Sequence, residues 1–240
     1  MFWANFIRPG KKKAVTEENE PVINNERKTL RATMSAYSDN EIYNFDESYK
    51  SLNENITICC FISKSGKIVS PTFVKHGLTI PCLYTDPPAD QNSEFTKWSR
   101  NGYDVYETKS KGMTDVIVDH IFQNKIGRSL VIIEKATWHQ SVSPKNKSFE
   151  HIKVELIKEG LTEYLQPLDM GFFSTVRNRN RSYRRNFIYY NDHTPSVIEK
   201  LSAAAKILHD MTPAVKFCWH LSGLTEEGRD MGRCYPLKRD

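Results

Sequence analysis

Two acidic residues, Glu134 and Asp169, stand at the ends of segments that the sequence predicts to be rigid. Glu134 closes the apolar, β-branched run 129–134, which is typical of a buried strand. Asp169 follows Pro167, a residue that favours the first turn of a helix. Carboxylate oxygens are the ligands that hard cations such as Mg²⁺ prefer. The pair predicts a metal site if the fold brings the two segments together.

The elements that must position these acids alternate between strands and helices. Strand patterns cover 42–46, 56–62, 68–74, 129–134 and 152–157, with weaker ones near 82–84 and 103–106. Helical patterns cover 22–38, 113–125, a stretch ending near 190, 195–209 and 213–221. This order predicts an α/β fold with a mixed five-stranded sheet flanked by helices. A third acid, Asp46, ends the first strand, and the sheet would place it beside Glu134.

Turn and edge signals refine this prediction. The segment 63–67 contains Gly66 and suits a tight hairpin between the second and third strands. Pro71 lies within the third strand pattern and has no N–H to donate to a ladder. We therefore expect that strand at an edge of the sheet.

Composition limits the class of protein. The chain has 240 residues, enough for one large domain, and its formal net charge is only +5. Any preference for polyanions must therefore come from local clustering. Five cysteines without a CxxC pair favour a reducing, intracellular compartment. No apolar run approaches the length of a membrane span or a signal peptide, so we expect a soluble protein.

One such cluster of positive charge follows Asp169. Arg177, Arg181, Arg184 and Arg185 fall on one face of the predicted helix, and no acid occurs between Asp169 and Asp192. Guanidinium groups in a row bind backbone phosphates. A merely solvated helix face is the alternative interpretation.

Five stretches of the sequence resemble motifs of one known family and occur in the same order as in that family. They are 37–48, the hairpin 62–67 leading to Ser70 and Pro71, the helix start at Met113 and Thr114, the run 130–139, and Leu165-Gln166-Pro167-Leu168-Asp169. Together they resemble the DDE-superfamily endonuclease domain of pogo, Tigger and jerky-type transposases, which has an RNase H-like fold. The resemblance implies a domain at 22–224, with a flexible lead-in at 1–21 and a C-terminal tail at 225–240.

The resemblance also implies roles for the acids. Asp46 matches the first catalytic carboxylate and Asp169 the third, while Glu134 stands where the family usually has an aspartate. Three such carboxylates would hold two Mg²⁺ or Mn²⁺ ions for phosphodiester cleavage and strand transfer. His139 would lie near the second acid, as a phosphate contact, a proton relay or a structural residue. Each acid also has a plainer interpretation, as a solvated strand end or a first-turn helix residue.

Three functions remain open from the sequence. The domain could be an active metal-dependent endonuclease, a domesticated or decayed relative that binds DNA or chromatin without cutting, or a scaffold that contacts other proteins. The resemblance implies DNA as the partner and a nuclear location, implies no membrane contact, and leaves a homo-oligomer open.

Overall fold

The computed structural model describes residues 18–48, 56–69, 71–76, 88–91, 95–100, 102–108, 120–122, 126–134 and 151–225. Its strands are β1 (Ile42–Ser48), β2 (Ile56–Ser63), β3 (Thr72–His76), β4 (Asp90–Gln91), β5 (Phe95–Arg100), β6 (Tyr103–Thr108), β7 (Ser129–Glu134) and β8 (Ile152–Ile157). Its helices are α1 (Glu20–Met34), α3 (Thr162–Leu165), the 3₁₀ helix η5 (Pro167–Asp169), α4 (Phe172–Asn191), α5 (Val197–Asp210) and α6 (Thr212–Leu221).

The strands form one mixed sheet in the order β4-β5-β6-β3-β2-β1-β7-β8. β1 is antiparallel to β2 and parallel to β7, and β7 is parallel to β8. The five main strands predicted from sequence form the part β3-β2-β1-β7-β8, and the weaker pattern near 103–106 is confirmed as β6. The predicted α/β class, with a mixed sheet and flanking helices, is confirmed. The predicted count of five is wrong, because β6, β5 and β4 extend the sheet beyond β3. β5 was not predicted, because only Phe95 of its six residues is buried and the strand shows no alternation of buried and exposed residues.

The edge position predicted for the third strand is also wrong. β3 pairs with β2 on one side and with β6 on the other. Pro71 precedes the strand, and its carbonyl accepts a hydrogen bond from the Asp104 N–H at 3.0 Å. The missing N–H of proline therefore removes no ladder bond. The predicted hairpin is confirmed, with the Ser63 N–H donating to the Lys67 carbonyl at 2.8 Å and Gly66 at φ +99°.

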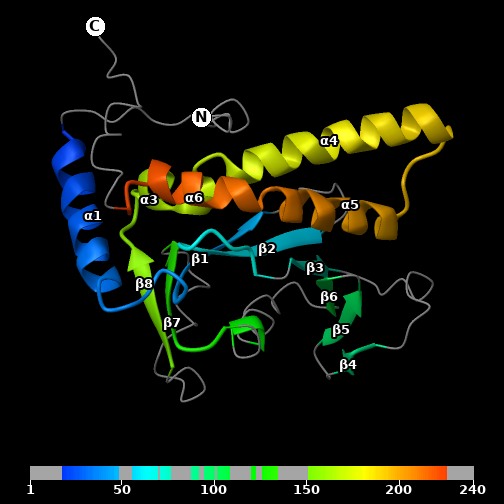
Figure 1. Cartoon of the computed structure of the whole chain (residues 1–240). Helices are drawn as coiled ribbons and strands as arrows, with labels where there is room; N and C mark the ends of the chain where they lie inside the picture. Colours follow the sequence, from blue (N-terminus) through cyan, green and yellow to red (C-terminus); the bar gives the residue numbers. More distant parts are fainter. Residues whose placement is uncertain are drawn as a thin grey trace, which may run out of the picture.

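Alternate residues of the strands other than β4 pack into two apolar cores, one on each face of the sheet. Ile42, Cys60 and Ile132 belong to the core that also contains buried residues of α1, α3, α4, α5 and α6. Phe45 and Val131 belong to the core on the opposite face. Figure 1 shows α4, α5 and α6 as a layer over one side of the sheet. Even-numbered positions of β1 and β7 therefore face this helical layer.

Some predicted segments lie wholly or partly outside the described residues. They are the lead-in at 1–17, the strand near 82–84, all but 120–122 of the helix at 113–125, and the tail from 226. Residues 120–122 are helical and Ile121 is buried, as predicted. Among the described residues, no helix is both long and apolar enough to cross a bilayer.

Candidate carboxylate and arginine site

The pairing of β1 with β7 aligns two of the predicted carboxylates. The two strands run parallel with Ile42 opposite Leu130 and Asn44 opposite Ile132. The same register, continued by two residues, brings Asp46 level with Glu134. Neighbouring strands lie about 4.8 Å apart, and both positions share the face that the helical layer covers. The sheet therefore places Asp46 and Glu134 side by side.

A buried asparagine connects the third acid to the same place. Asn44 is 0% exposed, and its Nδ2 donates to the Ile132 carbonyl at 2.8 Å. Its Oδ1 accepts from the Leu168 N–H at 3.0 Å. Leu168 precedes Asp169 in η5, so one side chain fixes both β7 and the turn that carries Asp169. Asn44 was not predicted as a site residue; the only signal for it in the sequence is an amide within an otherwise largely apolar strand pattern.

Asp169 lies in η5 and not in the first turn of α4. The chain turns between the two helices at Gly171, whose φ of +94° only glycine adopts at little cost. The Gly171 N–H donates to the Asp169 carbonyl at 2.7 Å. The hydroxyl groups of Ser174 and Thr175 both donate to the Gly171 carbonyl. The turn is thus held on both sides, and it presents Asp169 before α4 begins.

The electrostatics of Asp46 show that the acids lie near one another. Asp46 is 7% exposed, and burial raises the pKa of its carboxyl well above the usual range. The neighbouring carboxylates of Asp169, Glu47 and Glu134 raise this pKa further by charge repulsion. Asp169 is exposed and Glu134 half-buried, so the cluster reaches the solvent. The fold concentrates negative charge here, at the carboxyl ends of β1 and β7.

The donor chemistry of this cluster fits a hard divalent cation. Carboxylate oxygens are the ligands that Mg²⁺ and Mn²⁺ prefer, and a cation would relieve the repulsion on the buried Asp46. The side chains do not form a closed cage in this conformation, because no group of three His, Cys, Asp or Glu residues within the described ranges is arranged to hold a metal ion. His139 lies outside the described residues.

The predicted arginine face lies on α4 and begins next to the acids. The Arg177 Nη1 donates to the Ser48 hydroxyl at 3.2 Å, and Ser48 is two residues past Asp46 on β1. Arg181, Arg184 and Arg185 follow within the next three turns, and all three are exposed. At 3.6 residues per turn, the four guanidinium groups project from one side of the helix.

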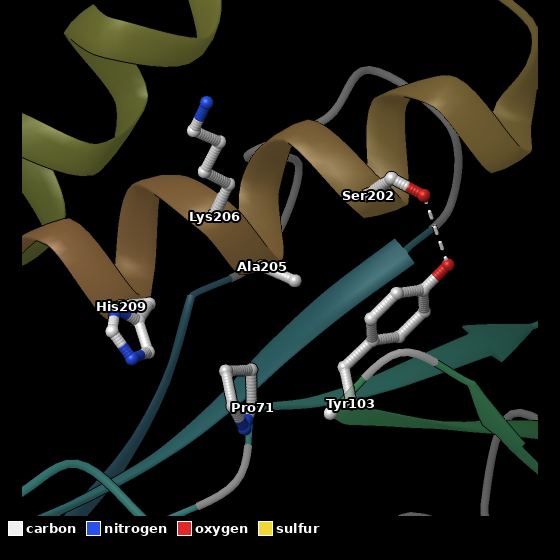
Figure 2. Close-up of a pocket in the computed structure, with 7 residues that line it drawn as sticks. Pro71, Tyr103, Ser202, Ala205, Lys206 and His209 are labelled. Carbon is white, nitrogen blue, oxygen red and sulfur yellow. Dashed lines mark hydrogen bonds between the residues drawn. The ribbon is translucent and has the colours of Figure 1, made fainter.

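A separate pocket of about 270 Å³ lies between α5 and the sheet. Figure 2 shows Tyr103 and Pro71 opposite α5, with the Tyr103 hydroxyl and the Ser202 hydroxyl 3.2 Å apart across one wall. The lining residues are Pro71, Gly102, Tyr103, Ser202, Ala205, Lys206 and His209. None of the three predicted carboxylates lines it, so the pocket and the acidic cluster are distinct features.

Comparisons with known proteins found structural similarity only. No family model and no curated protein matches the chain. A structure of the Mos1 transposase catalytic domain with raltegravir and Mn is 11% identical, with a TM-score of 0.39 over 86% of this chain and 96% of that one. Another of the Mos1 mariner transposase catalytic domain is 12% identical, with a TM-score of 0.38 over 87% and 97%. A Mos1 paired-end complex with the left transposon end is 12% identical, with a TM-score of 0.35 over 88% and 66%.

Proposed function

We propose that this chain is a DDE transposase-like DNA-processing domain that cleaves phosphodiester bonds with divalent metal ions. The observation that carries the proposal is the convergence of Asp46, Glu134 and Asp169. The first two are brought together by the β1–β7 register, and the third by the hydrogen bonds of Asn44. The charge repulsion at Asp46 supports their mutual proximity. The motifs that resemble the pogo, Tigger and jerky-type domains coincide with these positions.

In this proposal the three carboxylates hold the metal and Arg177 binds the DNA. A bound Mg²⁺ or Mn²⁺ would activate the attacking oxygen and stabilise the leaving oxygen of a phosphodiester. Arg177 lies beside Ser48 at the end of β1, where its guanidinium can donate hydrogen bonds to a backbone phosphate. Asn44 acts as a positioning residue, since it fixes the two backbone segments that carry Glu134 and Asp169.

A plasmid-nicking assay tests the proposal. Purified protein is incubated with supercoiled plasmid and Mg²⁺ or Mn²⁺, and conversion to the open circle is measured. Asp46→Asn and Asp169→Asn should each reduce nicking to the level seen with chelator. Asp210→Asn is the matched control, because Asp210 is an exposed acid at the end of α5. Nicking that survives both of the first two substitutions contradicts the metal-site assignment.

A DNA-binding protein that no longer cuts is the second candidate, and Glu134 favours it. The side chain of glutamate is one methylene longer than that of the aspartate usual in the family, and a displacement of ~1 Å in an active site can cost ~10²-fold in rate. Glu134→Asp separates the two candidates. Faster nicking by this variant supports the metal site, whereas a variant that binds DNA but still does not nick it supports the second candidate.

We also propose a nuclear location, since DNA is the proposed substrate. Imaging of the tagged full chain in cells tests it, and a signal confined to the cytoplasm contradicts it.

A further inference from the structure

The positive excess of the chain is concentrated on α4. This helix contains five arginines and neither an acid nor a lysine, so it accounts for the whole formal net charge of +5. The rest of the chain is neutral in sum. Like charges four residues apart destabilise a helix by about 0.2–0.5 kcal/mol per pair. The repulsion between these arginines works against the stability of the helix, which indicates that the charge serves binding.

Part of this charge forms a single row that ends in an aromatic residue. Arg177, Arg181, Arg185 and Tyr189 follow one another at intervals of four residues, and side chains at this spacing are neighbours on a helix. Tyr190 is the next residue, and its ring lies 5.1 Å from that of Tyr189 at an interplanar angle of 85°. We call this set, from Arg177 to Tyr190, the arginine–tyrosine row.

The two tyrosines are exposed in an unusual way for large aromatic residues. Tyr189 is 79% exposed and Tyr190 is 80% exposed. The edge-to-face arrangement of the pair leaves ring faces open to solvent. Both side chains stand on an ordered helix end, because Phe187 contacts the rings of Tyr183 and His193 and Asp192 ends the helix in the left-handed conformation. The pair is therefore a preformed aromatic surface next to a cationic one.

Nucleic acid with unpaired bases is the partner that fits this chemistry. Proteins that bind single strands combine cationic groups for the phosphates with aromatic rings on which bases stack. Paired bases in a duplex are already stacked on their neighbours, so only unpaired ones can use the tyrosine faces. The three arginines of the row are complementary in charge to a polyanion, and the tyrosines at its end are suited to stack bases.

We infer that the arginine–tyrosine row carries a DNA strand away from the acidic cluster and that Tyr189 and Tyr190 stack unpaired bases at its far end. This inference rests on the proposed function for the DNA contact at Arg177. Tyr189 lies twelve positions after Arg177, which is about 18 Å along a helix. At 3.4 Å per nucleotide along a B-form strand, this corresponds to about five nucleotides. The preferred substrate is a duplex that ends in an unpaired flank.

Equilibrium binding in the presence of chelator tests this inference without any contribution from cutting. Fluorescence anisotropy compares three DNA substrates: a blunt duplex, the same duplex with a ten-nucleotide 3′ overhang, and the same duplex with a ten-nucleotide 5′ overhang. Wild-type protein should bind one of the overhang substrates about 5-fold to 150-fold more tightly than the blunt duplex, the range expected from stacking of one base. The double variant Tyr189→Ala with Tyr190→Ala should lose this preference and keep its affinity for the blunt duplex.

Two controls make the result decisive. The double variant Tyr189→Phe with Tyr190→Phe keeps the rings and should retain the preference. Size-exclusion chromatography with light scattering, run on the wild type and the alanine variant, reports whether the tyrosines serve self-association. Equal affinity for blunt and overhang substrates in the wild type overturns the inference. An overhang preference that survives the alanine substitutions also overturns the inference. The same holds if the substitutions dissociate a dimer while the preference for overhangs remains.

The same measurements distinguish a failure of this inference from a failure of the proposed function. If the wild type binds the blunt duplex and nicks plasmid but shows no overhang preference, only the role of the tyrosines fails. If it binds none of the three DNA substrates, the DNA contact of the proposed function fails as well.

Discussion

Neutralising two arginines of α4 should weaken DNA binding in proportion to the lost phosphate contacts, without harm to the fold. The variant is Arg181→Gln with Arg185→Gln, both at exposed positions of the helix. If Arg177, Arg181, Arg184 and Arg185 each contact one phosphate, log K falls with log salt at a slope of about −3.6. Raising the salt from about 50 to about 200 mM then weakens binding about 150-fold.

The double variant should retain two contacts, a slope of about −1.8 and a loss of about 12-fold over the same salt range. Its free energy of unfolding should stay the same or rise by up to about 1 kcal/mol, because two repulsive pairs at four-residue spacing are removed. Anisotropy titrations of a labelled duplex at several salt concentrations give the slopes, and urea denaturation gives the stability.

The matched control removes two positive charges elsewhere. Lys28 on α1 and Lys158 after β8 are both exposed, and Lys28→Gln with Lys158→Gln lowers the net charge by the same amount. This control should leave the slope near −3.6. An unchanged slope in the arginine variant, or an equal fall in the control, refutes the assignment of α4 as the phosphate-binding face.

Three predictions concern the parts of the fold that hold the site. Asn44→Ala should lower the unfolding free energy by about 1–3 kcal/mol for each buried backbone group left without its partner, and it should reduce nicking. Unchanged stability in urea would contradict the role of Asn44 as a bridge between β7 and η5. Ser196→Ala should cost about 0.5–2 kcal/mol at neutral pH by removing the cap of α5. Hydrogen bonds from Ser196 hold the pKa of Glu199 below its usual value, so the part of this stabilisation that involves the carboxylate is present above about pH 4.3 and is lost as the pH falls through the lower folded pKa. The difference between the variant and the wild type should therefore become smaller in acid melts, while the bond that the Ser196 hydroxyl accepts from the Glu199 N–H remains. Gly66→Ala should destabilise the β2–β3 hairpin by about 1–2 kcal/mol, because φ is +99° there and the new methyl group would collide with a lysine side chain. The control Gly127→Ala should cost little, because Gly127 has open space around it and an ordinary φ. Equal melting temperatures for the two variants refute the argument from backbone conformation.

Much of the architecture could be predicted because its signals are local. β7 is a continuous apolar run and β2 is buried along its whole length, so composition alone indicates both strands. The hairpin at Gly66 follows from a residue type that tolerates positive φ. The helices after Asp169 follow from their periodicity, and the turn of η5 follows from the proline that begins it.

The features that the sequence did not predict depend on which strands and residues pair with one another, and the sequence alone does not show that pairing. Pro71 predicts a sheet edge, but it lies just outside β3, and β6 is the second neighbour of that strand. β5 carries mostly half-buried polar residues, so neither face shows a pattern. Asn44 is invisible as a positioning residue until the fold shows that its two partners come from segments 88 and 124 residues away.

The order of the strands predicted Asp46 beside Glu134, and the family resemblance implied that Asp169 joins them. Spacing in sequence does not bring Asp46 next to Glu134; the parallel pairing of β1 with β7 does. The position of Asp169 depends on a side-chain hydrogen bond and a glycine turn, neither of which a periodicity can show. The roles of Asp46, Glu134, Asp169 and His139 remain predictions for experiment.

Anomalous diffraction from crystals soaked in Mn²⁺ tests whether Asp46, Glu134 and Asp169 together form a divalent metal site. We expect at least one Mn²⁺ peak bound by carboxylate oxygens of Asp46 and Asp169, and no such peak in crystals of Asp46→Asn. Mn²⁺ bound only at other positions, or a peak that is unchanged in the variant, would contradict it.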